Sequence, residues 1–223
     1  MQTRTRIKIC GITRLRDAQC VADLGGDAIG LAFHSQSPRA IELKNALQIR
    51  QAMPPFVTVT ALFMDETEKW ISQVVETIMP DCLQFHGDEL PEFCRQWSRP
   101  FIKAVPMGSV DDASRYAEQY ADAQGFLLDS NVAGRQGGSG DTFDWSKIPS
   151  TFDFPLVLAG GLNPSNVVAA ITQVNPWGVD VSSGVEQSKG IKDHDLIEQL
   201  FDEVNRIDHN DEAGRRPYTQ PEI

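Results

Sequence analysis

The amino-acid sequence predicts a single closed (β/α)8 barrel, the TIM barrel, on the basis of three observations. Strand-like and helix-like segments alternate with little interruption along a chain of 223 residues. The strand-like segments read as continuous apolar runs, as the strands of a parallel sheet do when helices cover it. Eight such units in about 200 residues favour a closed barrel of eight parallel strands over an open doubly wound sheet.

The first half of the chain supplies four strand–helix units. The first strand-like segment is apolar and β-branched, and the helix that follows it closes at Gly25-Gly26. The second helix stops at Pro54-Pro55, because proline cannot continue a helix. The predicted strands are residues 6–12, 27–33, 56–64 and 82–86, and the predicted helices are residues 14–24, 43–53, 66–79 and a short one after Pro91.

The second half repeats the pattern and ends in a different kind of segment. The predicted strands are residues 101–105, 125–129, 155–161 and 177–184, and the helices are residues 111–121, a weak stretch at 143–148, 165–174 and 194–207. The last segment is polar, lacks apolar periodicity and contains two prolines. We therefore expect the barrel domain to span residues 1–207 and residues 208–223 to form a polar C-terminal tail.

Composition and charge narrow the classes of function. The sequence is 41% hydrophobic and 23% charged, as in an ordinary soluble globular protein. A net charge of −11 argues against nucleic acid as a partner, since binding its phosphates needs a basic surface. No apolar run approaches the roughly 20 residues that span a bilayer, and the N-terminus lacks a signal-peptide pattern. The four cysteines show no C-x-x-C spacing, so we expect reduced thiols and a cytoplasmic location.

The last two predicted strands each end in a turn of small residues. One run ends at Gly160-Gly161 and the other at Ser182-Ser183-Gly184. The backbone N–H groups of such turns are free to point at an anion, and a helix that begins there adds its positive dipole end. Because the loops after strands 7 and 8 form the usual phosphate site of a barrel, this pair predicts a small phosphorylated substrate.

Polar side chains at the carboxyl ends of the strands are the candidates for a catalytic site. The sequence contains no Ser-His-Asp elbow, no Walker loop and no metal-spaced histidine cluster, so we expect no metal site. Acid–base chemistry on a phosphorylated sugar is the interpretation that this pattern leaves. The candidates are Lys8, Cys10, Arg39, His86, Lys103, Asp129, Asp180, Ser182 and Ser183.

Each principal candidate has a structural alternative. Cys10 is either a small buried hydrophobic residue or, with Lys8 nearby, a thiol tuned toward thiolate that acts as a base. Asp129 either caps a turn or, because partial burial favours a protonated carboxyl group, donates a proton. Arg39 is either a solvated loop charge or the bidentate partner of a substrate carboxylate. His86 is the most ambiguous and could equally be a structural hydrogen-bonding residue.

Seven short motifs occur in order between about residue 6 and residue 207. Together they resemble the phosphoribosylanthranilate isomerase family; any one would be weak, but the ordered set is specific. They are Lys8-Ile-Cys-Gly-Ile-Thr13, Ser37-Pro-Arg39, Leu83-Gln-Phe-His-Gly-Asp88, Leu127-Leu-Asp129, Gly137-Gly-Ser-Gly140 before Phe143-Asp-Trp145, Ala159-Gly-Gly-Leu-Asn-Pro164 and Val179-Asp-Val-Ser-Ser-Gly-Val-Glu186.

The resemblance implies an isomerase of tryptophan biosynthesis that needs no metal or organic cofactor. It would carry out an Amadori rearrangement of N-(5-phosphoribosyl)anthranilate to the corresponding 1-deoxyribulose phosphate. By motif, Asp129 is the general acid that protonates the ring oxygen, and Cys10 is the general base that removes the C2′ proton. Arg39 would hold the anthranilate carboxylate. The phosphate would lie on backbone N–H groups around Gly160, Gly161, Ser183 and Gly184.

Two positions depart from the family pattern, and two other functions compete with it. Phe85 stands where leucine is more common, and Asp141 places an acid in a loop that often carries lysine. One rival is another phosphate-binding barrel isomerase, such as that of histidine biosynthesis, which uses two aspartates instead of Cys10 and Asp129. The other is a non-catalytic barrel that binds phosphorylated ligands, which would need neither residue. The sequence leaves a monomer, a homodimer and association with neighbouring pathway enzymes open.

Overall fold

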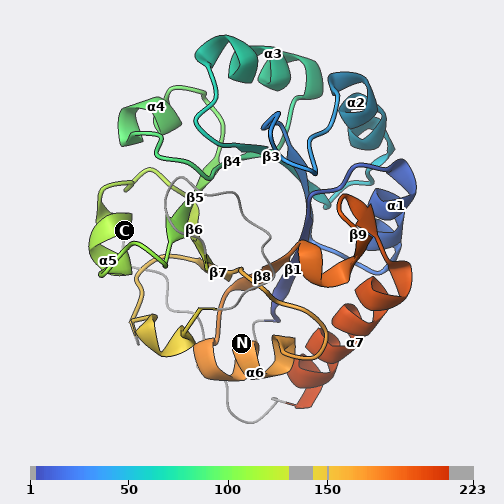
Figure 1. Ribbon diagram of the computed structural model, residues 1–223, viewed down its shortest axis with the longest axis vertical. Helices are drawn as coiled ribbons and strands as arrows, with labels where there is room; N and C mark the ends of the chain where they lie inside the picture. The colour runs from blue at the N-terminus through green and yellow to red at the C-terminus, as the bar shows by residue number, and fades with distance from the viewer. Residues whose placement is uncertain (1–3, 131–142, 150, 211–223) are drawn as a thin grey trace.

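Eight parallel strands close into a barrel in the computed structural model, which describes residues 4–130, 143–149 and 151–210 (Figure 1). Each strand pairs with the next, and β8 pairs with β1, where Lys8 lies opposite Asp180. The predicted fold class is therefore confirmed. The strands are β1 Arg6–Cys10, β2 Ala28–Ala32, β3 Thr58–Phe63, β4 Cys82–Phe85, β5 Phe101–Pro106, β6 Gly125–Asp129, β7 Leu156–Leu158 and β8 Gly178–Val181.

Helices surround the barrel as an outer layer (Figure 1). Polar caps fix several of their starts: the Thr67 side chain accepts a hydrogen bond from the Trp70 N–H at the start of α3, and Asp112 does the same for α5. The weak helical stretch after β6 is a single 3₁₀ turn, η1. The helices are α1 Leu15–Asp23, α2 Leu43–Ala52, α3 Glu68–Ile78, α4 Pro91–Arg95, α5 Ala113–Glu118, η1 Trp145–Lys147, α6 Val167–Val174 and α7 His194–Asn210. No helix of the described ranges is long and apolar enough to cross a membrane.

The segment after β8 contains structure that the sequence did not predict. A 3₁₀ turn, η2 (Ser183–Val185), leads into an antiparallel hairpin of β9 (Glu186–Ser188) and β10 (Ile191–Lys192). The last helix also continues through Asn210, beyond the predicted end at residue 207. Asp208 accepts hydrogen bonds from the Thr5 N–H at 2.7 Å and from its hydroxyl group at 3.0 Å, which anchors α7 beside β1. Residues 211–223 and Asp141 lie outside the described residues.

The core accommodates Phe85 in a cluster of aromatic rings. Phe85 is fully buried, and its ring centroid lies 6.2 Å from Phe63, 6.2 Å from Phe93 and 5.8 Å from Phe101. The contacts with Phe93 and Phe101 are edge-to-face, a geometry that is favourable beyond the burial of area. The larger side chain at this position thus packs against partners from β3, α4 and β5.

Lys103 is a structural residue rather than part of a site. Its Nζ lies 3.1 Å from Glu89 Oε2, with both side chains buried, and also donates to the Gly87 carbonyl. Glu89 in turn accepts from the N–H groups of Asp65 and Gly87, both at 2.9 Å. The ion pair therefore holds the loop after β4 against β5.

We expect Lys103→Met to lower the free energy of unfolding by about 3–5 kcal/mol, because it leaves a buried carboxylate without its cation. Urea unfolding monitored by circular dichroism measures this change. The double variant Lys103→Met/Glu89→Gln, which removes both charges, should recover part of the loss. A single-variant loss below about 1 kcal/mol, the size of an exposed pair, would contradict this assignment.

Candidate active site

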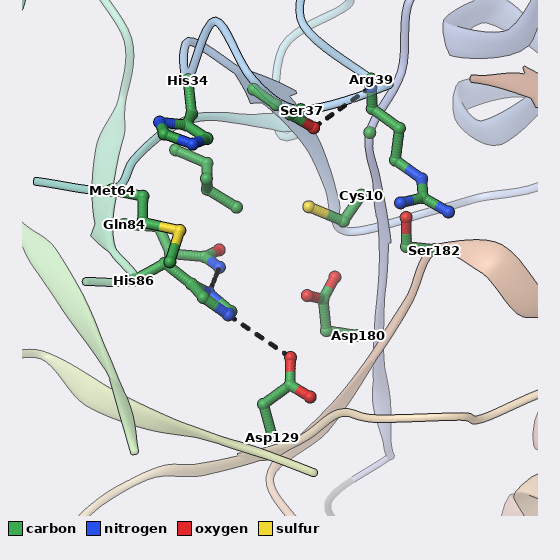
Figure 2. A pocket seen from close by; sticks show the side chains of 13 residues that line it. Cys10, His34, Ser37, Arg39, Met64, Gln84, His86, Asp129, Asp180 and Ser182 are labelled. Atoms are coloured by element: carbon green, nitrogen blue, oxygen red, sulfur yellow. Dashed lines mark hydrogen bonds and ion pairs between the residues drawn. The ribbon is translucent and has the colours of Figure 1, made fainter. Parts of the chain in front are cut away.

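A cavity opens at the carboxyl ends of the barrel strands (Figure 2). Six residues predicted from the strand-end pattern and the loop after the second strand line it together, although they are far apart in the sequence. They are Cys10, Arg39, His86, Asp129, Asp180 and Ser182. The closed barrel brings them together because every parallel strand delivers its last residues to the same rim.

Cys10 ends β1 and lies over a glycine of the neighbouring strand. Gly30 on β2 pairs with Cys10, and a Cβ atom at this glycine would lie 2.6 Å from the Cys10 Sγ atom. The absence of a side chain at position 30 is therefore what gives the thiol its place. Burial raises the pKa of the Cys10 thiol, and the field of the Lys8 ammonium offsets this rise only in part. Lys8 thus favours the thiolate, but it does not bring the pKa of the Cys10 thiol down to its ordinary value.

Lys8 forms a buried ion pair with Asp180. Its Nζ lies 2.9 Å from Oδ1 of Asp180, and each side chain is 8% exposed. Burial alone lowers the pKa of Lys8, but the Asp180 carboxylate and the Cys10 thiol outweigh burial, so that the pKa is raised. The Asp180 carboxylate therefore opposes the effect of the Lys8 charge on the thiol.

Asp129 forms one end of a row of polar side chains on the opposite wall (Figure 2). His86 Nε2 lies 3.5 Å from Oδ2 of Asp129, and His86 Nδ1 lies 3.1 Å from Nε2 of Gln84. The Ser130 hydroxyl donates to Oδ1 of Asp129 at 3.3 Å. Gln84 was not among the predicted candidates, yet its side chain is buried and its Oε1 has no hydrogen-bond partner among the described residues.

Arg39 is held at the rim by a residue that the sequence analysis did not assign to the site. Its Nε and Nη2 donate to the two carboxylate oxygens of Glu186, each at 2.8 Å. Lys192 Nζ donates to Oε1 of Glu186 at 3.0 Å and to the Ser182 carbonyl at 2.9 Å. Arg39 is therefore neither a solvated loop charge nor an unpaired cation, because part of its guanidinium is already occupied by Glu186.

The loops after β7 and β8 touch one another, as the phosphate-site prediction requires. A Cβ atom on Gly184 would overlap the Leu162 carbonyl oxygen. Gly160 and Gly161 adopt positive φ angles of 84° and 65°, which glycine reaches without strain. Within residues 4–130, 143–149 and 151–210, the N–H groups of Gly160, Gly161 and Ser183 find no backbone or side-chain acceptor. They are thus available to an anion, although Ser182 alone of the five predicted phosphate residues lines the cavity of Figure 2.

An apolar wall completes the cavity. Ala32, Leu62 and Met64 line it beside His34, whose Nδ1 lies 2.9 Å from Oε1 of Glu66. None of these residues was predicted to belong to the site, since an apolar residue at a strand end is indistinguishable in the sequence from a core residue. The cavity therefore combines apolar side chains with acidic, thiol and cationic groups, as a site for a charged aromatic ligand would.

Comparisons with known proteins identify the family. The family model described as N-(5′-phosphoribosyl)anthranilate (PRA) isomerase matches residues 7–203. The isomerase of that name from Alcanivorax borkumensis is 50% identical over 209 residues, covering 91% of this chain and 96% of that protein. Its counterpart from Pseudomonas fluorescens is 48% identical over 199 residues, covering 89% and 95%.

Solved structures give the same result. The crystal structure of phosphoribosyl anthranilate isomerase from Thermotoga maritima is 39% identical with a TM-score of 0.81, over 91% of this chain and 99% of that one. Another isomerase structure, in complex with reduced 1-(o-carboxyphenylamino)-1-deoxyribulose 5-phosphate, is 36% identical with a TM-score of 0.76, over 91% and 99%. On its ordered motifs, its barrel, its strand-end site and these matches, this chain belongs to the N-(5′-phosphoribosyl)anthranilate isomerase family.

Proposed function

We propose that this protein converts N-(5′-phosphoribosyl)anthranilate to 1-(2-carboxyphenylamino)-1-deoxyribulose 5-phosphate, an aldose–ketose isomerisation of tryptophan biosynthesis, in the cytoplasm. The observation that carries the proposal is that Cys10 and Asp129, a base and an acid on different strands, face one cavity that Arg39 also lines. The reaction needs one proton donor, one proton acceptor and a site for each of two anionic groups.

Asp129 is the general acid of the proposed mechanism. It protonates the furanose ring oxygen while the lone pair of the aniline nitrogen expels that oxygen, and the ring opens to a protonated Schiff base. Because the substrate nitrogen supplies the electron pair, this step requires no metal or organic cofactor. His86 and Ser130, 3.5 and 3.3 Å from the two carboxyl oxygens, orient the group toward the cavity.

Cys10 is the general base of the second step. Its thiolate removes the C2′ proton, and the electron pair of that bond moves toward the nitrogen to give a neutral enolamine. Tautomerisation then yields the ketone. Burial raises the pKa of the thiol, while Lys8 and Lys192 favour the thiolate through their charge, so the base is strong once it has lost its proton.

Three surfaces hold the substrate between these two groups. Arg39 binds the anthranilate carboxylate, the wall of Ala32, Leu62 and Met64 covers the benzene ring, and the loops after β7 and β8 bind the phosphate. Fixing both anionic ends of the substrate places its ribose between the acid and the base. Such positioning lowers the activation barrier by roughly several kcal/mol. The complex of the related isomerase with a reduced 5-phosphate compound supports a ligand of this class.

The assay that tests the proposal is the loss of phosphoribosylanthranilate fluorescence, with the substrate generated in situ in metal-free buffer. Rapid loss with the wild-type protein, and a loss slower by about 10²–10⁴-fold with Asp129→Asn, is expected. A folded wild-type protein that causes no loss would overturn the assignment and favour another sugar phosphate, such as the aminoaldose of histidine biosynthesis, or a non-catalytic role.

We expect Arg39→Ala to raise KM about 10–100-fold, because a charge-assisted hydrogen-bonded pair contributes roughly 1.5–3 kcal/mol. The value of kcat should change only a few-fold, since Arg39 does not take part in either proton transfer. Initial rates across substrate concentrations measure both constants. The exposed Arg206→Ala is the matched control, and an unchanged KM in Arg39→Ala would rule out the carboxylate contact.

Assembly is proposed as either a monomer or a homodimer. A related Thermotoga maritima isomerase, 37% identical with a TM-score of 0.76, is described as dimeric and has been studied as generated monomers. Sedimentation equilibrium at two protein concentrations distinguishes the two states here. Repeating it with the neighbouring pathway enzymes tests whether they associate.

A further inference from the structure

We infer that Glu186 is a positioning residue: it fixes the guanidinium of Arg39 so that one remaining edge is presented to the substrate carboxylate. The inference rests on the proposed function, in which Arg39 binds that carboxylate. It adds a residue that touches no reacting atom but determines how well the enzyme recognises a carboxylated aniline.

The geometry of the pair supports this role. A guanidinium offers two edges that can each pair with a carboxylate, one through Nε and Nη2 and one through Nη1 and Nη2. Glu186 occupies the first edge with two hydrogen bonds of 2.8 Å, and the Arg39 and Glu186 side chains are 8% and 5% exposed. In the part of the chain that the structure describes, Nη1 of Arg39 donates to no acceptor. The second edge is therefore left for a ligand.

The stem of Arg39 is constrained as well as its head. Gly11 has a φ of 73°, and a Cβ atom there would lie 2.5 Å from Cδ of Arg39 and 3.1 Å from the Ser182 hydroxyl. The arginine thus crosses directly over the residue that follows Cys10. Figure 2 shows the guanidinium beside Ser182 with Cys10 nearby. Because its aliphatic stem and its guanidinium are both held in place, Arg39 loses little further conformational freedom when it binds a carboxylate.

Glu186 is itself held by the β9–β10 hairpin. Lys192 lies opposite Glu186 in this hairpin, and the Lys192 N–H donates to Oδ2 of Asp17, a fully buried residue of α1, at 3.3 Å. Arg14 binds both Asp17 oxygens and also donates to the Lys192 carbonyl at 3.0 Å. These contacts fix the hairpin to the first helix, so the Glu186 carboxylate has a defined position.

Lys192 balances the charge of the arrangement. The Glu186 carboxylate beside Arg39 would cancel the positive charge that attracts a substrate carboxylate. However, the Lys192 ammonium lies 3.0 Å from Oε1 of Glu186, the oxygen that also accepts from Nε of Arg39. Burial alone would raise the pKa of Glu186, yet its bonds to Arg39 and Lys192 outweigh burial and lower it. One anion between two cations leaves a net charge of about +1, the charge of a free arginine, on a rigid support.

Orientation and simple attraction make opposite predictions for Glu186→Gln. The substitution removes a negative charge, so attraction alone would tighten binding of the anionic substrate and lower KM. If Glu186 orients Arg39, KM for the anthranilate substrate should instead rise by about tenfold, as expected on loss of a charge-assisted pair. The value of kcat/KM for the analogue made from aniline, which lacks the carboxylate, should change by less than about twofold.

The experiment therefore measures kcat/KM for both substrates and the specificity ratio, which is kcat/KM for the anthranilate substrate divided by kcat/KM for the aniline analogue. The five proteins are wild type, Glu186→Gln, Glu186→Asp, Arg39→Ala and Arg39→Ala/Glu186→Gln. We expect the ratio to fall in Glu186→Gln and, less strongly, in Glu186→Asp, which keeps the charge but shortens its reach. In the Arg39→Ala background, Glu186→Gln should have no further effect on the ratio, since its partner is absent. The exposed Glu198→Gln is the matched control.

The outcomes separate the inference from the proposed function. A ratio unchanged in Arg39→Ala would refute the carboxylate contact itself. A ratio that falls in Arg39→Ala but stays at the wild-type value in both Glu186 variants would refute only the positioning role. Equal losses for both substrates in the Glu186 variants would also refute it, because a general structural defect does not distinguish a carboxylated ring from a plain one. If Glu186→Gln does not fold, Glu186→Asp alone decides by the same ratio.

Discussion

Asp129→Asn is expected to lower kcat by about 10²–10⁴-fold while leaving the fold intact, since that is the usual contribution of a positioned proton donor. The asparagine amide has nearly the same shape, and its oxygen can still accept the hydrogen bond from the Ser130 hydroxyl. It cannot give a proton to the furanose oxygen. The value of KM should change little, because Asp129 binds neither of the anionic groups.

Steady-state fluorescence assays give kcat and KM for this variant, and thermal unfolding confirms that it is folded. The exposed Asp122→Asn is a matched control that changes the net charge equally and should retain full activity. A folded Asp129→Asn protein with more than about a tenth of the wild-type kcat would show that another group supplies the proton.

Cys10→Ala should also lower kcat by about 10²–10⁴-fold, and its pH dependence identifies the base. A general base acts in its deprotonated form. Because burial raises the pKa of Cys10 above the ordinary value of 9.0, the thiolate fraction and kcat/KM should increase as the pH rises from neutral toward 9. Cys10→Asp substitutes a carboxyl group whose ordinary pKa of about 3.9 lies well below this range.

The measurement is the ratio of wild-type kcat/KM to that of Cys10→Asp between about pH 6.5 and 9, because the ratio cancels the titration of other groups and of the substrate. It should rise by about tenfold per pH unit. A ratio independent of pH would mean that the thiol does not act as the base. Loss of activity in Cys10→Ala without loss of secondary structure separates catalysis from folding.

The sequence was sufficient for the barrel and for most of the rim. Strand periodicity does not depend on distant contacts, and parallel topology brings all strand ends to one face. That is why the order of residues alone predicts that Cys10, Asp129 and Asp180 share one site. The local pattern also indicated the loops after β7 and β8, whose adjacency follows from strand order alone.

What could not be predicted depends on tertiary contacts. Glu186 and Arg39 are separated by 147 residues, and the hairpin that joins them has strands of three and two residues, too short to show a pattern. Gln84 was overlooked because a single polar residue in an apolar strand gives no sign of its orientation. The sequence left the protonation state of Cys10 open, because it shows that Lys8 is near but shows neither the burial of the thiol nor the ion pair of Lys8 with Asp180.

Barrel closure has a consequence for the life of the nascent chain. The pairs Lys8–Asp180, Arg39–Glu186 and Arg14–Lys192 span 172, 147 and 178 residues, so each joins the first part synthesised to the last. Until residues 178–192 leave the ribosome, Lys8 and Arg39 lack the carboxylates of Asp180 and Glu186, and the thiol of Cys10 has no enclosed cavity. Contacts of such separation form slowly. The site therefore cannot be complete before the final strand and the hairpin after it have been made, and a chain interrupted before that point carries the acid and the base without their cavity.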